Sequence, residues 1–171
     1  MEINNDNLGG WAISSQLLNE AIRLAKYGKI LEIGSGTGTK ELRKIADVIS
    51  IEHDHKWLPE PVLAPTNHES YLVPIESTTG WYSVPQIETV LKGLSYDLII
   101  VDGPKRNGRH GFLHNFELFD STAAIIIDDV NRPNIKLMAD LIQKILDRPY
   151  RVINTDEKRA FAVFERTRMM L

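Results

Sequence analysis

The chain has 171 residues, a net charge of −3 and no cysteine. Its hydrophobic fraction of 43% and charged fraction of 25% are typical of a soluble globular protein, and its length predicts one domain over residues 1–171. The lack of cysteine excludes disulfides and thiolate metal sites, and the negative charge disfavours non-specific binding to nucleic acid or to an anionic membrane. Because no apolar run approaches the roughly 20 residues of a membrane helix and the N-terminus lacks a signal-peptide pattern, we expect a cytoplasmic protein.

Short apolar runs alternate along the chain with longer stretches of helical periodicity, a pattern that predicts βαβ units around a parallel sheet. In chain order, the predicted elements are a helix over 11–27, a strand over 29–33, a helix over 39–46, strands over 48–52 and 70–75, a helix over 84–94, a strand over 96–101, a short helix over 112–119, a strand over 123–127, a helix over 133–146, and a hairpin of 150–153 and 160–164. Residues 1–28 are expected to form an N-terminal cover and the first helix. The pattern predicts an α/β, Rossmann-like doubly wound fold.

The helix predicted over 133–146 carries apolar residues at helical spacing, and we expect all of them to face the core. They are Ile135, Leu137, Met138, Leu141, Ile142 and Ile145. In contrast, three prolines within residues 55–68 leave room for at most a broken helical turn there.

Four of the predicted strands lead directly into glycine or acidic residues. The first is followed by residues 34–38 (Gly-Ser-Gly-Thr-Gly), and the others end in Glu52, in Asp102 and in the pair Asp128 and Asp129. Ligands of open α/β sheets bind at the carboxyl edge of the strands, near the point where the strand order reverses. We therefore expect these residues to line one ligand site.

The glycine turn has GxGxG spacing, because residue 39 is threonine where the dinucleotide fingerprint GxGxxG has its third glycine. Glycine permits positive φ and lets a ligand approach the backbone closely. The spacing favours a nucleoside cofactor without a pyrophosphate, and Glu52, 18 residues after Gly34, can accept both ribose hydroxyls. The alternatives are a turn that needs glycine for its shape alone and a solvated charge at a strand end.

Three segments together resemble the class I S-adenosylmethionine (SAM)-dependent methyltransferases, in particular their O-methyltransferase-like branch. They are residues 31–38 (Leu-Glu-Ile-Gly-Ser-Gly-Thr-Gly), 50–54 (Ser-Ile-Glu-His-Asp) and 96–104 (Tyr-Asp-Leu-Ile-Ile-Val-Asp-Gly-Pro). The resemblance implies a mostly parallel seven-stranded sheet with a C-terminal antiparallel hairpin, and SAM as methyl donor. The cofactor contacts that it implies are Glu32, Gly34, Ser35, Gly36, Gly38, Glu52, His53, Ile75, Glu76 and Asp102.

Three carboxylates, Asp102, Asp128 and Asp129, are expected at the same sheet edge, and three oxygen ligands with open positions suit Mg²⁺. The arrangement is similar to metal-dependent catechol and sugar O-methyltransferases, in which acidic residues after the fourth and fifth strands hold the metal. In the catechol type, a lysine three residues past the first Asp is the general base, which implies this role for Lys105. The alternative is that these aspartates only cap helices and order turns.

The basic segment 105–111 (Lys-Arg-Asn-Gly-Arg-His-Gly) follows Asp102 directly. Methyl transfer to oxygen requires alignment of the nucleophile and removal of its proton. Lys105 or His110 could take that proton, and Arg106 or Arg109 could bind a carboxylate or phosphate of the acceptor. The alternative is a solvated loop that contacts no ligand.

The sequence therefore predicts a SAM-dependent methyltransferase that acts on an oxygen of a small or saccharide-like, anionic acceptor, with Mg²⁺ as a further cofactor. With no separate substrate domain, the acceptor pocket would be built from residues 1–14, 55–68 and 104–112, or completed by a second copy in a homodimer. The alternatives are an aminopropyltransferase-like enzyme and a SAM-binding module without catalytic activity.

Overall fold

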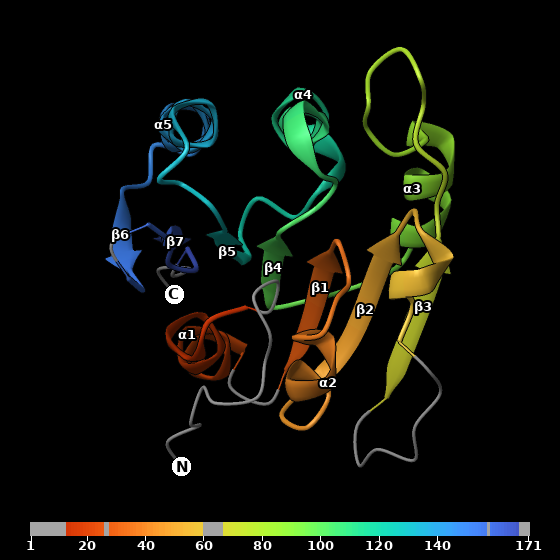
Figure 1. The fold of residues 1–171 in the computed structure, drawn as a ribbon, viewed down its shortest axis with the longest axis horizontal. Helices are drawn as coiled ribbons and strands as arrows, with labels where there is room; N and C mark the ends of the chain where they lie inside the picture. The colour runs from red at the N-terminus through yellow and green to blue at the C-terminus, as the bar shows by residue number, and fades with distance from the viewer. Residues whose placement is uncertain (1–12, 26–27, 60–66, 157, 168–171) are drawn as a thin grey trace.

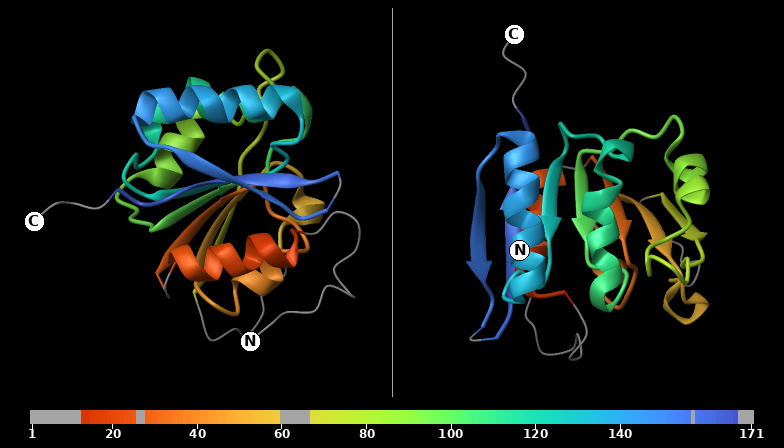
Figure 2. Two further views of the ribbon diagram at one scale, coloured as in Figure 1. Left: turned by 90° about the vertical axis from the view of Figure 1, so that its left-hand side faces the viewer. Right: turned by 90° about the horizontal axis from the view of Figure 1, so that it is seen from above.

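The computed structural model describes residues 13–25, 28–59, 67–156 and 158–167. One seven-stranded sheet lies between two layers of helices, with α1 and α2 on one face and α3, α4 and α5 on the other (Figures 1 and 2). The strands are β1 (Lys29–Ile33), β2 (Asp47–Glu52), β3 (His68–Leu72), β4 (Leu98–Val101), β5 (Ala124–Ile127), β6 (Tyr150–Asn154) and β7 (Ala160–Phe164). Their order is β3-β2-β1-β4-β5-β7-β6, and β7 runs antiparallel to both of its neighbours. The predicted doubly wound, mostly parallel fold with a C-terminal hairpin is confirmed.

The central strands are apolar along their length because helices cover both faces of the sheet. In β5, for example, Ile125 and Ile127 join the core on the side of α5, while Ala124 and Ile126 join the core on the side of α1. The outermost strands β3 and β6 contain only partly buried and exposed residues, as expected at the edges of a sheet. The strand order reverses between β1 and β4, so the ligand edge predicted from the sequence lies at the centre of the molecule.

The α-helices are α1 (Ser15–Ala25), α2 (Thr39–Leu42), α3 (Val84–Leu91), α4 (Gly111–His114) and α5 (Pro133–Leu146), and the 3₁₀ helices are η1 (His55–Trp57), η2 (Arg106–His110) and η3 (Phe116–Leu118). The bounds of α5 agree with the prediction. It begins with a proline in its first turn, and Asp147, which caps its C-terminal end, adopts φ 48°. In α1, the side chain of Ser14 accepts a hydrogen bond from Leu17 N (3.1 Å).

Several predicted elements are shorter in the structure. The helix predicted over 39–46 stops at Leu42, and the next residues form tighter turns such as Lys44 N to Glu41 O (3.1 Å). The strand predicted over 70–75 lies earlier, at His68–Leu72, because Pro74 lacks the N–H that would extend the ladder. The segment expected as a loop after Asp102 instead contains η2.

The prediction that every apolar residue of the last helix faces the core is wrong for three of them. Leu137, Leu141 and Ile145 lie on the outer side of α5, with 56%, 36% and 59% of their surface exposed. Their spacing of four residues places them on one stripe. The buried face consists of Ile135, Met138, Ala139 and Ile142.

Part of the N-terminal prediction lies outside the described residues. This holds for residues 1–12 of the expected cover and for residues 26–27 at the end of the first helix. Within the residues that are described, no helix is both long and apolar enough to cross a membrane.

Candidate active site

The glycine turn follows β1 and lies directly against the segment that follows β4. Gly34 adopts φ 93°, and its N–H donates to Ile51 O (2.9 Å). On the other side, Asp102 N and Gly103 N both donate to Ile33 O (2.9 and 2.6 Å). A Cβ on Gly34 would lie 2.4 Å from Gly103 N, so the two backbones touch where a side chain would have to be. Glycine at position 34 is therefore required by the fold itself.

Glu32, in β1, holds the glycine turn in place through a chain of hydrogen bonds. Its carboxylate is buried and accepts hydrogen bonds from Thr39 Oγ1 (2.9 Å) and Ser50 Oγ (2.7 Å). Thr39 Oγ1 in turn accepts from Gly36 N (2.9 Å). Burial raises the pKa of Glu32 from 4.5 to about 8, and the bonds from Ser50 and Thr39 oppose that rise. Glu32, a predicted cofactor contact, thus lies behind the turn and holds its shape.

Replacing Glu32 by glutamine should remove a pH-dependent loss of stability. In the range between pH 4.5 and 8 the native carboxyl keeps a proton that the unfolded chain has lost, so the free energy of unfolding falls as pH rises through this range. The slope from one such group is at most about 1.4 kcal/mol per pH unit. Urea unfolding of wild type and Glu32→Gln at pH 6.5 and 8 should show a smaller decrease for the variant. Equal decreases would contradict the assignment.

The end of β2 presents Glu52 to a cavity. Glu52 is buried, and its Oε1 accepts from His53 N (2.7 Å) and Asp54 N (2.8 Å). Next along the chain, η1 brings Trp57 to the same place, where its carbonyl accepts from Ser35 Oγ (2.8 Å). The glycine turn and the segment after β2 thereby form two walls of one site.

This glycine-turn cavity has a volume of about 530 Å³, within the range of small-molecule sites. It gathers nine of the predicted site residues, namely Gly34, Ser35, Gly36, Glu52, His53, Asp102, Lys105, Asp128 and Asp129. They come from the ends of β1, β2, β4 and β5, as the topology requires. Lys105 Nζ lies 5.4 Å from the centre of the Trp57 ring, so these two side chains meet at the rim.

Asp102, Asp128 and Asp129, here called the carboxylate cluster, surround the guanidinium of Arg109. Arg109 Nη2 donates to Asp102 Oδ1 (2.9 Å) and to Asp102 O, while Nη1 donates to Asp129 Oδ2 (3.1 Å) and Asp128 O (3.0 Å). Burial raises the pKa of Asp102, against the opposing effect of Arg109. Burial and then the charges of the other two aspartates raise the pKa of Asp128 to about 7. Asp129 adopts φ 64°, which aspartate tolerates better than most residues.

The carboxylate cluster does not fit the predicted Mg²⁺ site. In the predicted site, oxygens of all three residues would be directed at one open point, since Mg²⁺ demands near-ideal octahedral geometry. Instead, Arg109 lies between Asp102 and Asp129, and Asp128 Oδ1 accepts from Asp129 N (2.9 Å). Within the described ranges no group of three or more His, Cys, Asp or Glu side chains could hold a metal ion. The spacing of the three aspartates in the sequence did not reveal that the guanidinium of Arg109 lies between them.

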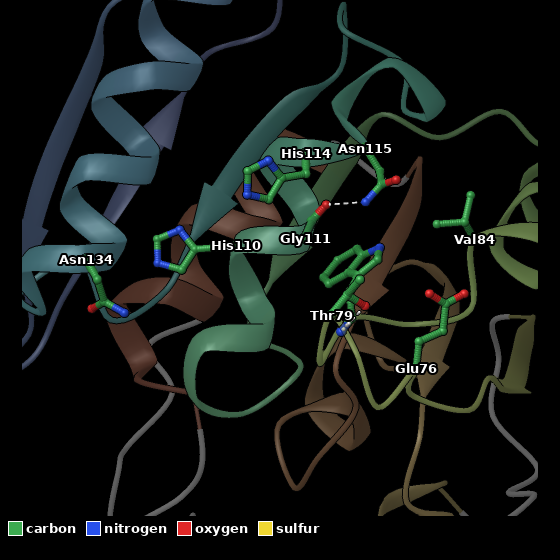
Figure 3. Close-up of a pocket in the computed structure, with 9 residues that line it drawn as sticks. Glu76, Thr79, Val84, His110, Gly111, His114, Asn115 and Asn134 are labelled. Carbon is green, nitrogen blue, oxygen red and sulfur yellow. Dashed lines mark hydrogen bonds between the residues drawn. The ribbon is translucent and has the colours of Figure 1, made fainter.

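Four other predicted residues do not line the glycine-turn cavity. Gly38 packs against Ile13, since a Cβ on it would lie 2.3 Å from that side chain. Ile75 lies past the end of β3, in a bridge with Tyr82. Glu76 and His110 line a second cavity of about 640 Å³ beside α4, with Glu76 and His110 toward opposite ends (Figure 3).

The second cavity is separated from the glycine turn by η2, which contributes Arg109 to one side and His110 to the other. Gly108 of η2 touches the turn before Trp81, because a Cβ on it would lie 2.0 Å from Gly80 O. His110 therefore lies away from the glycine-turn cavity, in which it was predicted to take the proton of the acceptor.

The glycine-turn cavity also contains residues that were not predicted to be site residues. They are Trp57, Gly103, Pro104, Asn131, Arg132, Lys158 and Arg159. Three of them are cationic and come from the β5–α5 segment and the β6–β7 turn, which lie far apart in the sequence. In the sequence, the polar residues between the two strands of the predicted hairpin were the one sign of a further functional segment. Only the fold shows that this turn reaches the ligand edge of the sheet.

No protein-family model and no curated protein sequence matches the chain. Similar proteins are found only when its structure is compared with solved structures. Among solved structures, the O-methyltransferase TomG of Streptomyces achromogenes in complex with SAM has a TM-score of 0.62 at 18% identity, over 95% of this chain and 84% of that one. The O-methyltransferase of Bacillus cereus in complex with S-adenosylhomocysteine (SAH) has a TM-score of 0.61 at 16% identity, over 94% and 85%.

A third similar structure is the methyltransferase MycE of the mycinamycin biosynthetic pathway in complex with Mg and SAH. Its TM-score is 0.54 at 15% identity, and the match covers 89% of this chain but 49% of MycE. Identities this low establish a shared fold. The chain therefore has the fold of the class I SAM-dependent methyltransferases, in the form found in their O-methyltransferase-like branch.

Proposed function

We propose that this protein is a SAM-dependent methyltransferase that transfers a methyl group to an oxygen of a small anionic acceptor. The observation that carries the proposal is that the glycine turn, Glu52 and Asp102 line one cavity at the reversal point of a sheet with this fold. SAM, when bound there, supplies an electrophilic methyl group on its sulfonium. The protein must then hold the donor, align the acceptor and receive its proton.

Glu52 is suited to hold the ribose of the donor. Two backbone N–H groups fix its Oε1, and within the described part of the chain no hydrogen bond to Oε2 is present. A carboxylate held in this way can accept hydrogen bonds from both ribose hydroxyls. In the glycine turn, the ligand can approach the backbone of Gly36 closely, because the space where a Cβ would lie has no atom within 4 Å.

Asp102 is the group we assign to the acceptor proton. Burial raises its pKa, which makes its carboxylate a stronger base than a solvated aspartate. One of its oxygens, Oδ1, is held by Arg109 Nη2 (2.9 Å), so the side chain has a fixed orientation at the cavity wall. Lys105 lines the same cavity but lies at its rim over Trp57. This position is more suited to closing the site over the ligands.

An anionic acceptor is supported by the cationic side chains around the opening. Arg132, Lys158 and Arg159 line the cavity beside Lys105 and Arg109. Arg132 and Arg159 are paired with Asp129 (3.2 Å) and Asp156 (2.9 Å), whereas no ion pair of Lys158 is found within the described part of the chain. Such a rim would attract a carboxylate or phosphate on a small or saccharide-like acceptor.

The proposal is tested with Asp102→Asn in a methyl-transfer screen that uses labelled SAM over phenols, sugars, nucleotides and carboxylates. We expect the variant to bind SAH within a few-fold of wild type, because asparagine keeps the shape, and to lose about 10²- to 10⁴-fold in turnover, the usual contribution of a general base. Lys105→Met is the comparison and should retain more activity than Asp102→Asn. The reverse order would move the role of base to Lys105.

A further inference from the structure

The guanidinium of Arg109 is held by the ends of two neighbouring strands. Its four hydrogen bonds go to Asp102 at the end of β4 and to Asp128 and Asp129 after β5. Its side chain is only 5% exposed. A buried guanidinium is costly unless its charge is paired, and here both Nη atoms are paired although Nε has no hydrogen-bond partner among the described residues. We therefore regard this arrangement as a built site rather than a surface ion pair.

The backbone around Arg109 fixes its approach to the strands. Gly108 touches Gly80, and a Cβ on Gly111, which directly follows η2, would lie 2.2 Å from the ring of the next residue in that turn, Trp81. η2 is therefore confined between the turn of residues 76–82 and the sheet edge. Arg109 projects from this confined segment to the carboxylate cluster, where Arg132 adds a second guanidinium at 3.2 Å from Asp129 Oδ2.

We infer that Arg109 is the resident cation of the carboxylate cluster and occupies the place that a divalent metal ion would need. It neutralises Asp102 and Asp129 and holds the Asp102 carboxylate at the wall of the glycine-turn cavity, which makes it a positioning residue. Two monovalent guanidiniums beside three carboxylates leave little net charge to attract a divalent ion. This inference concerns the carboxylate cluster itself and goes beyond the proposed methyl transfer.

Direct titration with Mn²⁺, followed by electron paramagnetic resonance of the free ion, tests the inference. Wild type should bind no Mn²⁺ at this site. Arg109→Ala removes the cation and opens the space between the carboxylates, so it should bind Mn²⁺ at least about tenfold more tightly than wild type. The double variant Arg109→Ala with Asp102→Asn should lose that gain. An Arg109 whose role is only to pack the loop would give no such gain.

Arg109→Lys is the matched control because it keeps one positive charge without the planar fork. It should bind no more Mn²⁺ than wild type and should recover part of the turnover that Arg109→Ala loses. If Arg109→Ala does not fold, Arg109→Met, which removes the charge but keeps most of the side-chain volume, takes its place and should show the same gain. Asp102-dependent binding of Mn²⁺ by wild type, or a folded Arg109→Ala without any gain, would overturn the inference. SAH binding is measured separately, so a failure here is distinguishable from a failure of the proposed function.

Discussion

Gly34→Ala is expected to be the most destabilising single substitution in the site. It places a Cβ 2.4 Å from Gly103 N and imposes φ 93° on a residue that strongly disfavours it. Backbone strain and the forced separation of the two segments should together cost about 3 kcal/mol or more. For a domain of this size, this corresponds to a decrease in Tm of roughly 10 °C. Thermal unfolding followed by circular dichroism measures it.

Gly36→Ala is the matched control for that substitution. A Cβ on Gly36 meets nothing within 4 Å, so the variant should unfold within about 1 °C of wild type. Because Gly36 lines the cavity, the added methyl group should instead weaken SAH binding. If Gly34→Ala were as stable as wild type, or if Gly36→Ala bound SAH normally, the two glycines would not have the separate roles assigned here.

Glu52→Gln should reduce the affinity for SAH by about 10- to 100-fold, because a charged acceptor of two ribose hydroxyls becomes a neutral one. The amide oxygen can still accept from His53 N and Asp54 N, so the fold around the end of β2 should be preserved. Isothermal titration calorimetry measures the change. Glu69→Gln, on the exposed edge strand β3, is the control and should leave the affinity unchanged. An unchanged affinity of Glu52→Gln for SAH would contradict the assignment of Glu52 to the ribose.

The fold was predictable where burial alone determines the pattern of residues. β4, β5 and β7 are covered on both faces, so their sequences are uninterrupted apolar runs, and α5 is long enough for its periodicity to be recognised. The short helices were less predictable, because η2 and α4 are stabilised by contacts with Trp81 and Gly80 that lie far away in the sequence. The outward stripe of α5 was missed since leucine and isoleucine have the same appearance in the sequence whether they are covered or exposed.

The walls of the site were predictable for a topological reason. Residues that end parallel strands must meet at one edge, and this brings Gly34, Glu52 and Asp102 together in the glycine-turn cavity. The direction of a loop side chain follows no such rule. The sequence places Arg109 in a basic segment without periodicity. Its guanidinium reaches the carboxylate cluster from a segment that packs against residues distant in the sequence, such as Gly80.

The most direct test of the central claim is calorimetric titration of the wild-type protein with SAH, SAM, decarboxylated SAM and NAD. We expect one SAH or SAM per chain with a Kd in the micromolar range or below, weaker binding of decarboxylated SAM, and no binding of NAD. The SAH signal should be weakened by Glu52→Gln and unaffected by chelators, because the site contains Glu52 and the carboxylate cluster already contains Arg109. Tight binding of NAD without binding of SAM or SAH would contradict the account.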